Sequence, residues 1–350
     1  MVYCRVEVSK MTETKRKRSA GRRILTAALI ALCVVLLLLL GVRGYFRLSV
    51  RNYYRHAEKT FVIPGLSDGM IVQGLAYEEE KGDFFVTGYR ADGAASQVSL
   101  VHRADGKEQK RLSLADQSGS AYLGHVGGIT VANDFVYVAD EAGLMAYSLS
   151  DFYAAADGGT VTAVGFFPTK TADDSLAVAF VHNDGENIYV GEFFREQNYP
   201  TPDSHKYTTA AGDESPALLL SFRLDKDAPC GIAPTVEKAY SIPGLVQGMC
   251  IDDAGNICLS TSYAAAFSHL YVYGTPQTEG EVTVLGQTLP RYVLDSSCLK
   301  ADIKAPPMAE EIVTVDGKLY TMCESATDKY IFGKFTSAKY CYAADLAAWL

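Results

Sequence analysis

The sequence predicts an all-β protein: a single β-propeller of five blades, preceded by one transmembrane helix. Three observations lead to this prediction. A pattern of strand, short polar turn and strand occurs five times along the chain. The string IPGLSDGMIVQGL at 63–75 returns in shortened form as IPGLVQGM at 242–249, as expected of a repeat fold. One run, residues 24–42, is long and apolar enough to cross a membrane.

The five hairpins set the number of blades. Each joins two apolar strands through a turn rich in Gly, Asp or Asn, which is the signal for tight antiparallel pairing. The repeats are spaced by 51, 53, 69 and 62 residues, counted between the second strands that begin near Phe84, Phe135, Ile188, Ile257 and Leu319. Six blades are the alternative, if a further repeat lies within residues 90–120 or 275–305.

Each hairpin is followed by a third candidate strand, and four of the five by a fourth. The fourth strands are expected at KRLSLA, TVTAVGFF, EKAYSIPG and PRYVLD. The fifth repeat lacks one, but KTFVIPG at 59–65 matches KAYSIPG at 238–244. We therefore expect residues 59–65 to complete the last blade and close the ring, which leaves no open sheet edge.

The N-terminal region predicts a membrane anchor. The basic string KRKRSAGRR at 15–23 directly precedes the apolar run, an arrangement that keeps the N-terminus in the cytoplasm. We divide the chain into a cytoplasmic stub (1–23), a signal anchor (24–42), a juxtamembrane stalk or short packed helix (43–58) and an extracytoplasmic propeller (59–350). A cleaved signal peptide is the alternative, although no small-residue cleavage site follows the run. Met11 is an alternative start.

The charge distribution limits which partners are expected, and the cysteine content bears on the redox compartment. Residues 1–43 carry a net charge of +7, so the remainder carries −16 of the overall −9. An acidic body repels phosphate backbones, and nucleic acid is therefore not an expected partner. Six of the eight cysteines lie beyond the apolar run, where an oxidising compartment would permit disulfides. Cys250 and Cys258 flank a turn and are expected to face each other, as a disulfide or as buried thiols.

The strings VQGLAY, VQGMCID and EEIVTVDGKLY each open a strand with a polar or acidic pair before a short hairpin. In this the chain resembles, over most of residues 60–345, bacterial propellers of the NHL, SMP-30/gluconolactonase-like and strictosidine synthase-like kind. The resemblance to the gluconolactonase-like group implies a metal at the channel mouth that activates water. Glu310 or Glu311 would then be a ligand, and Gln73 and Gln247 would position the substrate. The chain departs from that group in its expected metal ligands. Those enzymes use acidic and Asn ligands from several blades, whereas here two blades have Gln at this position and one has Gly127.

Propeller geometry brings the starts of inner strands and the ends of second strands to one face, where propellers usually bind ligands. The strand starts supply Gln73, His125, Gln247, Glu310 and Glu311. The second-strand ends supply Tyr89, Arg90, Asp140, Glu192, Ser262 and Glu324. Such oxygen-rich residues could hold Ca²⁺ or another divalent cation.

Each of these residues also has a structural alternative. The two glutamines would bond neighbouring backbone, and His125 would be a satisfied core residue rather than a base. Adjacent residues of a strand face opposite sides, so only one of Glu310 and Glu311 is expected to point into the channel. Residues 193–217 are longer than a hairpin needs and predict an ordered lid carrying His205, or a disordered insertion.

The expected function is ligand binding by a single-pass, membrane-anchored, extracytoplasmic propeller. The ligand is a small molecule or a protein, and the site comprises Gln73, His125, Glu192, His205, Gln247, Glu310, Glu311 and Glu324. The alternatives are a metal-dependent lactonase- or esterase-like hydrolase and a scaffold subunit of an envelope complex. The chain contains no G-x-S-x-G elbow and no nucleotide-binding motif, so whether it is an enzyme stays open.

Overall fold

The computed structural model describes the backbone of residues 2–350 and the side chains of Met11 and of residues 21–350. Met1 and the basic side chains at 15–18, on which the predicted orientation depends, lie outside this description. The chain divides into two compact units, residues 1–49 and Val50–Leu350.

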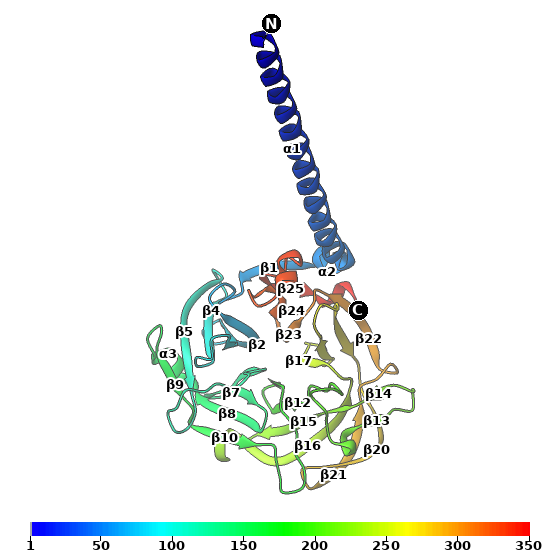
Figure 1. The fold of residues 1–350 in the computed structure, drawn as a ribbon. Helices are drawn as coiled ribbons and strands as arrows, with labels where there is room; N and C mark the ends of the chain where they lie inside the picture. Colours follow the sequence, from blue (N-terminus) through cyan, green and yellow to red (C-terminus); the bar gives the residue numbers. More distant parts are fainter. Residues whose placement is uncertain (1) are drawn as a thin grey trace. The chain divides into compact units, whose positions relative to one another are not determined.

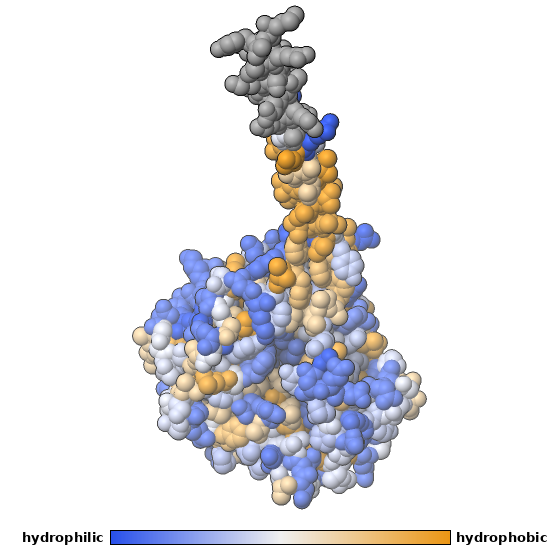
Figure 2. All heavy atoms as spheres, in the orientation of Figure 1, coloured by the Kyte–Doolittle hydropathy of each residue, from blue (hydrophilic) through white to orange (hydrophobic). Residues whose placement is uncertain are grey.

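The first unit is a single helix, α1 (Val2–Ser49), which contains the predicted span. Within the described part of the chain, Gly21–Ser49 is the segment that is long and apolar enough to cross a membrane. Its large apolar side chains between Ile24 and Leu40 are exposed (Figure 2). A helix satisfies its own backbone hydrogen bonds, so such a segment suits a membrane anchor or a signal sequence.

The second unit, Val50–Leu350, forms five blades around a common centre, as predicted (Figure 1). The first blade consists of β2 (Met70–Glu78), β3 (Asp83–Arg90), β4 (Gln97–His102) and β5 (Lys107–Ala115). The second consists of β6 (Ile129–Ala132), β7 (Phe135–Asp140), β8 (Gly143–Ser148) and β10 (Gly165–Pro168). The third consists of β11 (Phe180–Asn183), β12 (Asn187–Gly191), β15 (Ala217–Leu224) and β16 (Ile232–Ile242).

The fourth blade consists of β17 (Val246–Ile251), β18 (Ile257–Thr261), β19 (Ser268–Tyr273) and β22 (Leu299–Ala305). The fifth consists of β23 (Ala309–Val315), β24 (Lys318–Cys323), β25 (Tyr340–Asp345) and β1 (Ala57–Val62). The innermost strands β2, β6, β11, β17 and β23 each contact the innermost strands of both neighbouring blades. The starts of these strands therefore surround one point.

The ring is closed by the N-terminal strand, as the sequence predicted. Strand β1 begins at Ala57 and pairs antiparallel with β25, with Lys59 opposite Tyr342. Just before it, helix α2 (Arg51–His56) packs on the same blade, where the buried ring of Tyr53 meets Tyr342 edge-on at 6.0 Å. The segment expected as a stalk or a short helix is therefore helical, with residues 43–49 continuing α1.

Two predicted fourth strands were wrong in detail. The string TVTAVGFF is divided between β9 (Thr160–Thr162), which runs parallel to β5 of the first blade, and β10 of the second. PRYVLD does not complete the fourth blade, because β22 takes that position. Instead β20 (Gln277–Val284) and β21 (Gln287–Val293) form a hairpin that extends the third blade, with β21 parallel to β16. The packing of Tyr292 against Tyr240, with ring centroids 5.4 Å apart, helps to hold it there.

The two cysteines predicted to face each other do so within the fourth blade. Cys250 and Cys258 are directly opposite in β17 and β18, and both side chains are buried. The cysteines that the structure describes are all free thiols. The pair therefore takes the buried-thiol form of the prediction.

Candidate functional site

Three inner strands carry a β-bulge at the same place, near their start. The irregular pairing lies between Val72 and Leu75 in β2, between Val246 and Gly248 in β17, and between Ala309 and Ile312 in β23. The residues within the bulges are Gln73 and Gly74, Gln247, and Glu310 and Glu311. A bulge re-aims side chains that strict alternation would send to opposite faces. Glu310 and Glu311 lie within the bulge of β23 and are both buried, each 1% exposed.

Glu311 lies at the point where the blades meet. Its Oε2 accepts hydrogen bonds from the backbone N–H of Leu75 (3.0 Å) and of Ile129 (2.7 Å). Its Oε1 accepts one from the N–H of Val181 (3.2 Å). Burial raises the pKa of Glu311 well above its ordinary value, while the three N–H groups act in the opposite direction. One carboxylate of the fifth blade is thus hydrogen-bonded to the inner strands of the first, second and third blades.

Glycines make room for this carboxylate. A Cβ atom added at Gly248 would stand 2.4 Å from the Cα of Glu311, and one at Gly128 would stand 2.9 Å from its Oε1. A Cβ at Gly74 would stand 2.9 Å from the backbone nitrogen of Ile129. The Gly of each VQG string is therefore required by close approach at the centre. These contacts give Glu311 a structural role, and its place in a ligand site stays a prediction.

Three predicted residues, His125, Glu310 and Glu324, belong to a second cluster around Tyr89, on the side where the inner strands begin and the second strands end. The ring of His125, which is exposed, stacks on Tyr89 with centroids 4.5 Å apart. Glu324 is buried and accepts hydrogen bonds from Tyr330 (2.9 Å) and Tyr89 (3.5 Å) at its Oε1. These residues come from the first blade, the segment before the second, and the fifth. We call Tyr89, His125, Glu310, Glu324, Lys329 and Tyr330 the mouth cluster.

Glu310 is the deepest member of the mouth cluster and is incompletely bonded. Its Oε1 is buried and has no hydrogen-bond partner anywhere in residues 21–350. Burial raises the pKa of Glu310 well above its ordinary value, and the charge of Glu324 raises it further, whereas Lys329 lowers it. An orphaned buried carboxyl oxygen is unusual in a folded protein and calls for an explanation.

Lys329 and Tyr330 are the members that the sequence did not indicate. They follow β24 in the connection to β25, which spans residues 324–339 and is itself far longer than a hairpin needs. The same length criterion that singled out residues 193–217 would have found them.

Glu192 and His205 meet as a pair, but in a cluster of their own. Both carboxylate oxygens of Glu192 lie 3.0 Å from His205 Nδ1, and Asp174 Oδ1 lies 3.3 Å from His205 Nε2. Glu192 also accepts a hydrogen bond from the N–H of Leu218 (2.9 Å). No hydrogen bond or ion pair described for residues 21–350 joins these side chains to Glu310 or Glu324. Their contacts fix the insertion to the third blade.

The insertion is ordered and contains three short elements, a 3₁₀ turn at Asp203–His205 and strands β13 (Tyr207–Thr208) and β14 (Glu214–Ser215). It is attached to the hairpin region of β20 and β21. The guanidinium of Arg291 lies over the ring of Tyr207 at 4.4 Å, and Ser296 N–H donates to Asp213 at 2.8 Å. The alternative of a disordered segment is therefore wrong, and its role as a lid stays a prediction.

The two predicted glutamines make only local bonds. Gln73 is buried and donates to the carbonyl of Val72 at 2.8 Å, while Gln247 donates to the hydroxyl of Ser262 at 3.4 Å. These contacts match the structural alternative for both side chains. Their role in positioning a ligand stays a prediction.

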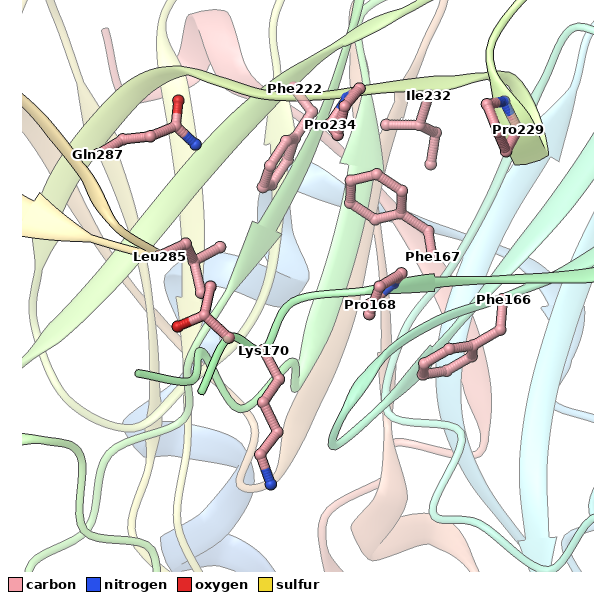
Figure 3. Close-up of a pocket in the computed structure, with 11 residues that line it drawn as sticks. Phe166, Phe167, Pro168, Lys170, Phe222, Pro229, Ile232, Pro234, Leu285 and Gln287 are labelled. Carbon is pink, nitrogen blue, oxygen red and sulfur yellow. The ribbon is translucent and has the colours of Figure 1, made fainter. Parts of the chain in front are cut away.

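A separate pocket lies at the rim between the second and third blades (Figure 3). It has a volume of about 300 Å³ and is walled by Phe167, Phe222, Ile232 and Leu285, with the first two rings edge-to-face at 5.0 Å. Figure 3 shows the ammonium group of Lys170 directed away from these apolar side chains. Specific small-molecule sites combine an apolar wall with convergent polar groups, which here are found at the mouth instead.

The residues at the mouth do not form a metal site of the expected kind. Nowhere in the described part of the chain do three His, Cys, Asp or Glu side chains come together in a way that could hold a metal ion. Lys329 also supplies a positive charge beside Glu324, at 3.6 Å. The donor set therefore does not fit the divalent cation that the resemblance implied, and we derive no step through a metal.

The chain has only distant similarity to the known proteins compared with it. No protein-family model and no curated protein matches the chain. Similar solved structures include PQQ-bound aldose sugar dehydrogenase from Streptomyces coelicolor, at 14% identity and TM-score 0.40, covering 82% of this chain and 97% of that one. A gluconolactonase from Xanthomonas campestris shares 11% identity at TM-score 0.37, covering 83% and 95%.

A glutaminyl cyclase from Myxococcus xanthus shares 10% identity at TM-score 0.38, covering 83% of this chain and 94% of that one. At these identities and TM-scores the similarities say nothing of what this protein binds or does.

Proposed function

We propose that this protein is a membrane-anchored, extracytoplasmic β-propeller that binds a small-molecule or protein ligand at its channel mouth. The observation that carries the proposal is the orphaned Oε1 of Glu310, buried in a cluster of polar and aromatic side chains from separate blades. Glu311, by contrast, has both of its oxygens bonded. The Oδ2 of Asp295 is a second orphaned carboxyl oxygen, and what distinguishes Glu310 is the polar and aromatic cluster around it. A bound ligand would supply the missing partner.

Thermal shift with the full-length chain in detergent or nanodiscs tests the proposal. Polar metabolites and envelope extracts would be screened against wild type and against the double variant Glu310→Gln, Glu324→Gln. A ligand that binds only the native state raises the melting temperature by mass action. We expect at least one compound or partner to stabilise wild type and not the double variant, with Glu237→Gln, an exposed acid, behaving as wild type.

A second outcome concerns the scaffold alternative. Stabilisation by a protein fraction alone, with the same dependence on Glu310 and Glu324, would identify the ligand as a protein. Ligands whose effect is unchanged in the double variant would contradict the proposed site.

The anchored state rests on the apolar segment of α1. We expect the chain recovered from membranes to retain residues 1–42, which mass spectrometry of the intact protein would show. Protease added outside sealed cells or spheroplasts should digest the propeller. A mature chain that starts after residue 42 would mean that the segment is a signal sequence.

A further inference from the structure

The mouth cluster already holds an ammonium group, and it belongs to the protein itself. The Nζ of Lys329 donates to the hydroxyl of Tyr89 and lies 5.0 Å from the centre of that ring. It lies 5.1 Å from the centre of the Tyr330 ring and 3.6 Å from Glu324 Oε1. The side chains of Tyr89, Tyr330 and Glu324 thus surround one cation, with the Tyr89 hydroxyl accepting its hydrogen bond and Glu324 supplying the opposite charge; we call this arrangement the cage.

Lys329 alone does not satisfy the carboxyl groups of the cage. Glu310 and Glu324 are 1% and 6% exposed, so both carboxyl groups are largely removed from water. Together they face one ammonium group in this cluster, and one of their oxygens has no partner among the described residues. Burial raises the pKa of both carboxyl groups, and a cation beside them lowers it again and so favours their charged form. The deeper part of the cage therefore favours positive charge and hydrogen-bond donors.

Lys329 can leave the cage without a change of fold. Its side chain is 43% exposed, so its stem reaches the cage from the solvent side. The backbone around it is fixed independently, since Asp328 N–H donates to the carbonyl of Leu66 and Tyr330 N–H to that of Thr327. Rotation about the four side-chain bonds of lysine is sufficient to move the ammonium group into solvent.

We propose that the mouth cluster recognises a primary alkylammonium group of the ligand, and that Lys329 occupies this position until the ligand displaces it. The proposal rests on the proposed ligand site and names the chemical class that the site accepts. An incoming ammonium group would meet the hydroxyl of Tyr89, the side chain of Tyr330 and the carboxylate of Glu324. Its further N–H groups would reach toward the orphaned oxygen of Glu310.

Chemical rescue of an emptied cage tests this directly. In the full-length chain, Lys329→Ala removes the internal ammonium group and leaves Glu310 and Glu324 without their cation. n-Butylammonium chloride should raise the melting temperature of this variant, and n-butanol, its neutral counterpart, at the same concentration and ionic strength should not. Wild type should need about tenfold more amine or beyond for the same shift, because the internal lysine competes.

Matched variants define the site. Adding Glu324→Gln to Lys329→Ala should abolish the rescue. Lys339→Ala should show none, because Lys339 lies over the Tyr340 ring at 5.2 Å without a described buried acid beside it. Lys329→Met, which keeps the apolar stem, replaces the alanine variant if that variant does not fold. A lysine-containing peptide amide, compared with n-butylammonium, distinguishes a peptide from a free amine as the source of the group.

The proposal would be overturned if n-butanol raised the melting temperature of Lys329→Ala as much as n-butylammonium does. It would also be overturned if the rescue survived Glu324→Gln, or if about 100 mM amine gave no rescue. The proposed function fails separately, when no ligand of any charge depends on Glu310 and Glu324. A neutral ligand that depends on both residues would leave the proposed function standing and refute the ammonium group.

Discussion

Glu310 and Glu311 are neighbours in the chain, equally buried, and bonded in opposite ways. Glu311 accepts three backbone N–H groups from three other blades, whereas one oxygen of Glu310 has no partner among residues 21–350. Both residues lie within the bulge of β23, between the inner strands of the two neighbouring blades. One residue therefore belongs to the architecture, and its neighbour is the one that we propose for the ligand.

Glu311→Gln should destabilise the fold by about 3 kcal/mol, because an amide offers one acceptor oxygen to three buried donors, and each unsatisfied donor costs about 1–3 kcal/mol. Urea unfolding of the full-length chain in detergent measures the change. Glu310→Gln is the matched control and should cost less than about 1 kcal/mol, since it removes a buried acid that lacks a full set of partners. Equal losses in the two variants would contradict the structural role of Glu311.

His205 makes stability depend on pH. Burial by itself lowers the pKa of His205, but its contacts with Glu192 and Asp174 outweigh burial, and the net shift is upward. A histidine whose pKa is raised on folding contributes stability that is complete below its unfolded pKa of about 6.5. That contribution is lost as the pH rises through the folded pKa. The stability difference between wild type and His205→Gln should therefore shrink as the pH rises above about 6.5.

Urea midpoints of the two proteins, measured from about pH 5.5 to about pH 9, would show this convergence. The control is His269→Gln. His269 pairs with Asp302 at 2.6 Å on the surface, where both side chains are exposed and an ion pair contributes little. A His205 difference that stays constant or grows with pH would contradict the assignment.

At the scale of elements, the closing strand β1 joins the fifth blade to the first. Phe61 is 3% exposed and packs against Phe84 of β3 with ring centroids 5.2 Å apart, and Phe84 in turn packs against Tyr320 of β24. A strand that only covered an edge would not need a buried aromatic side chain between two blades. The seam between the first and last blades depends on this residue.

Phe61→Ala should cost about 3–5 kcal/mol, as expected for removal of a buried aromatic ring. The adjacent Val62 is 53% exposed, so Val62→Ala should change stability by less than about 0.5 kcal/mol. Differential scanning calorimetry of the full-length variants measures both. A small loss of stability in Phe61→Ala would mean that the propeller does not depend on the contact between its first and last blades.

The elements also show which features could be predicted from the sequence. Hairpins carry local signals, alternating apolar residues around Gly- or Asn-rich turns, and all five were found at their expected positions. The parallel pairs β5–β9 and β16–β21 carry no such signal, because their partners lie in other repeats. The bulges were missed for the same reason: VQG reveals a repeat, but the Glu311 carboxylate that requires its glycine lies in another blade. Lys329 enters the mouth from a loop whose path the strands do not determine.

At the scale of the whole molecule, the apolar segment of α1 should control membrane association. An arginine at the centre of a span costs about 2.5–3.5 kcal/mol on insertion scales. Leu36→Arg together with Leu37→Arg should therefore shift most of the protein out of the membrane pellet after an alkaline carbonate wash. Leu48→Arg, near the end of the helix, should remain in the pellet because its side chain can reach the interface. Retention of the double variant would show that another part of the chain binds the membrane.

The pairing of β1 with β25 also determines when the fold can be completed during translation. Thr60 donates to the carbonyl of Cys341, 281 residues later in the chain. Strand β1 is among the first parts of the propeller to be synthesised, yet it must wait without a partner until its neighbour arrives. Through nearly all of translation the nascent propeller is an incomplete ring, and the strands at its two ends have unpaired backbone N–H and C=O groups. Any arrest before residues 340–345 leaves that ring unfinished, so we expect this protein to depend on chaperones while it is made.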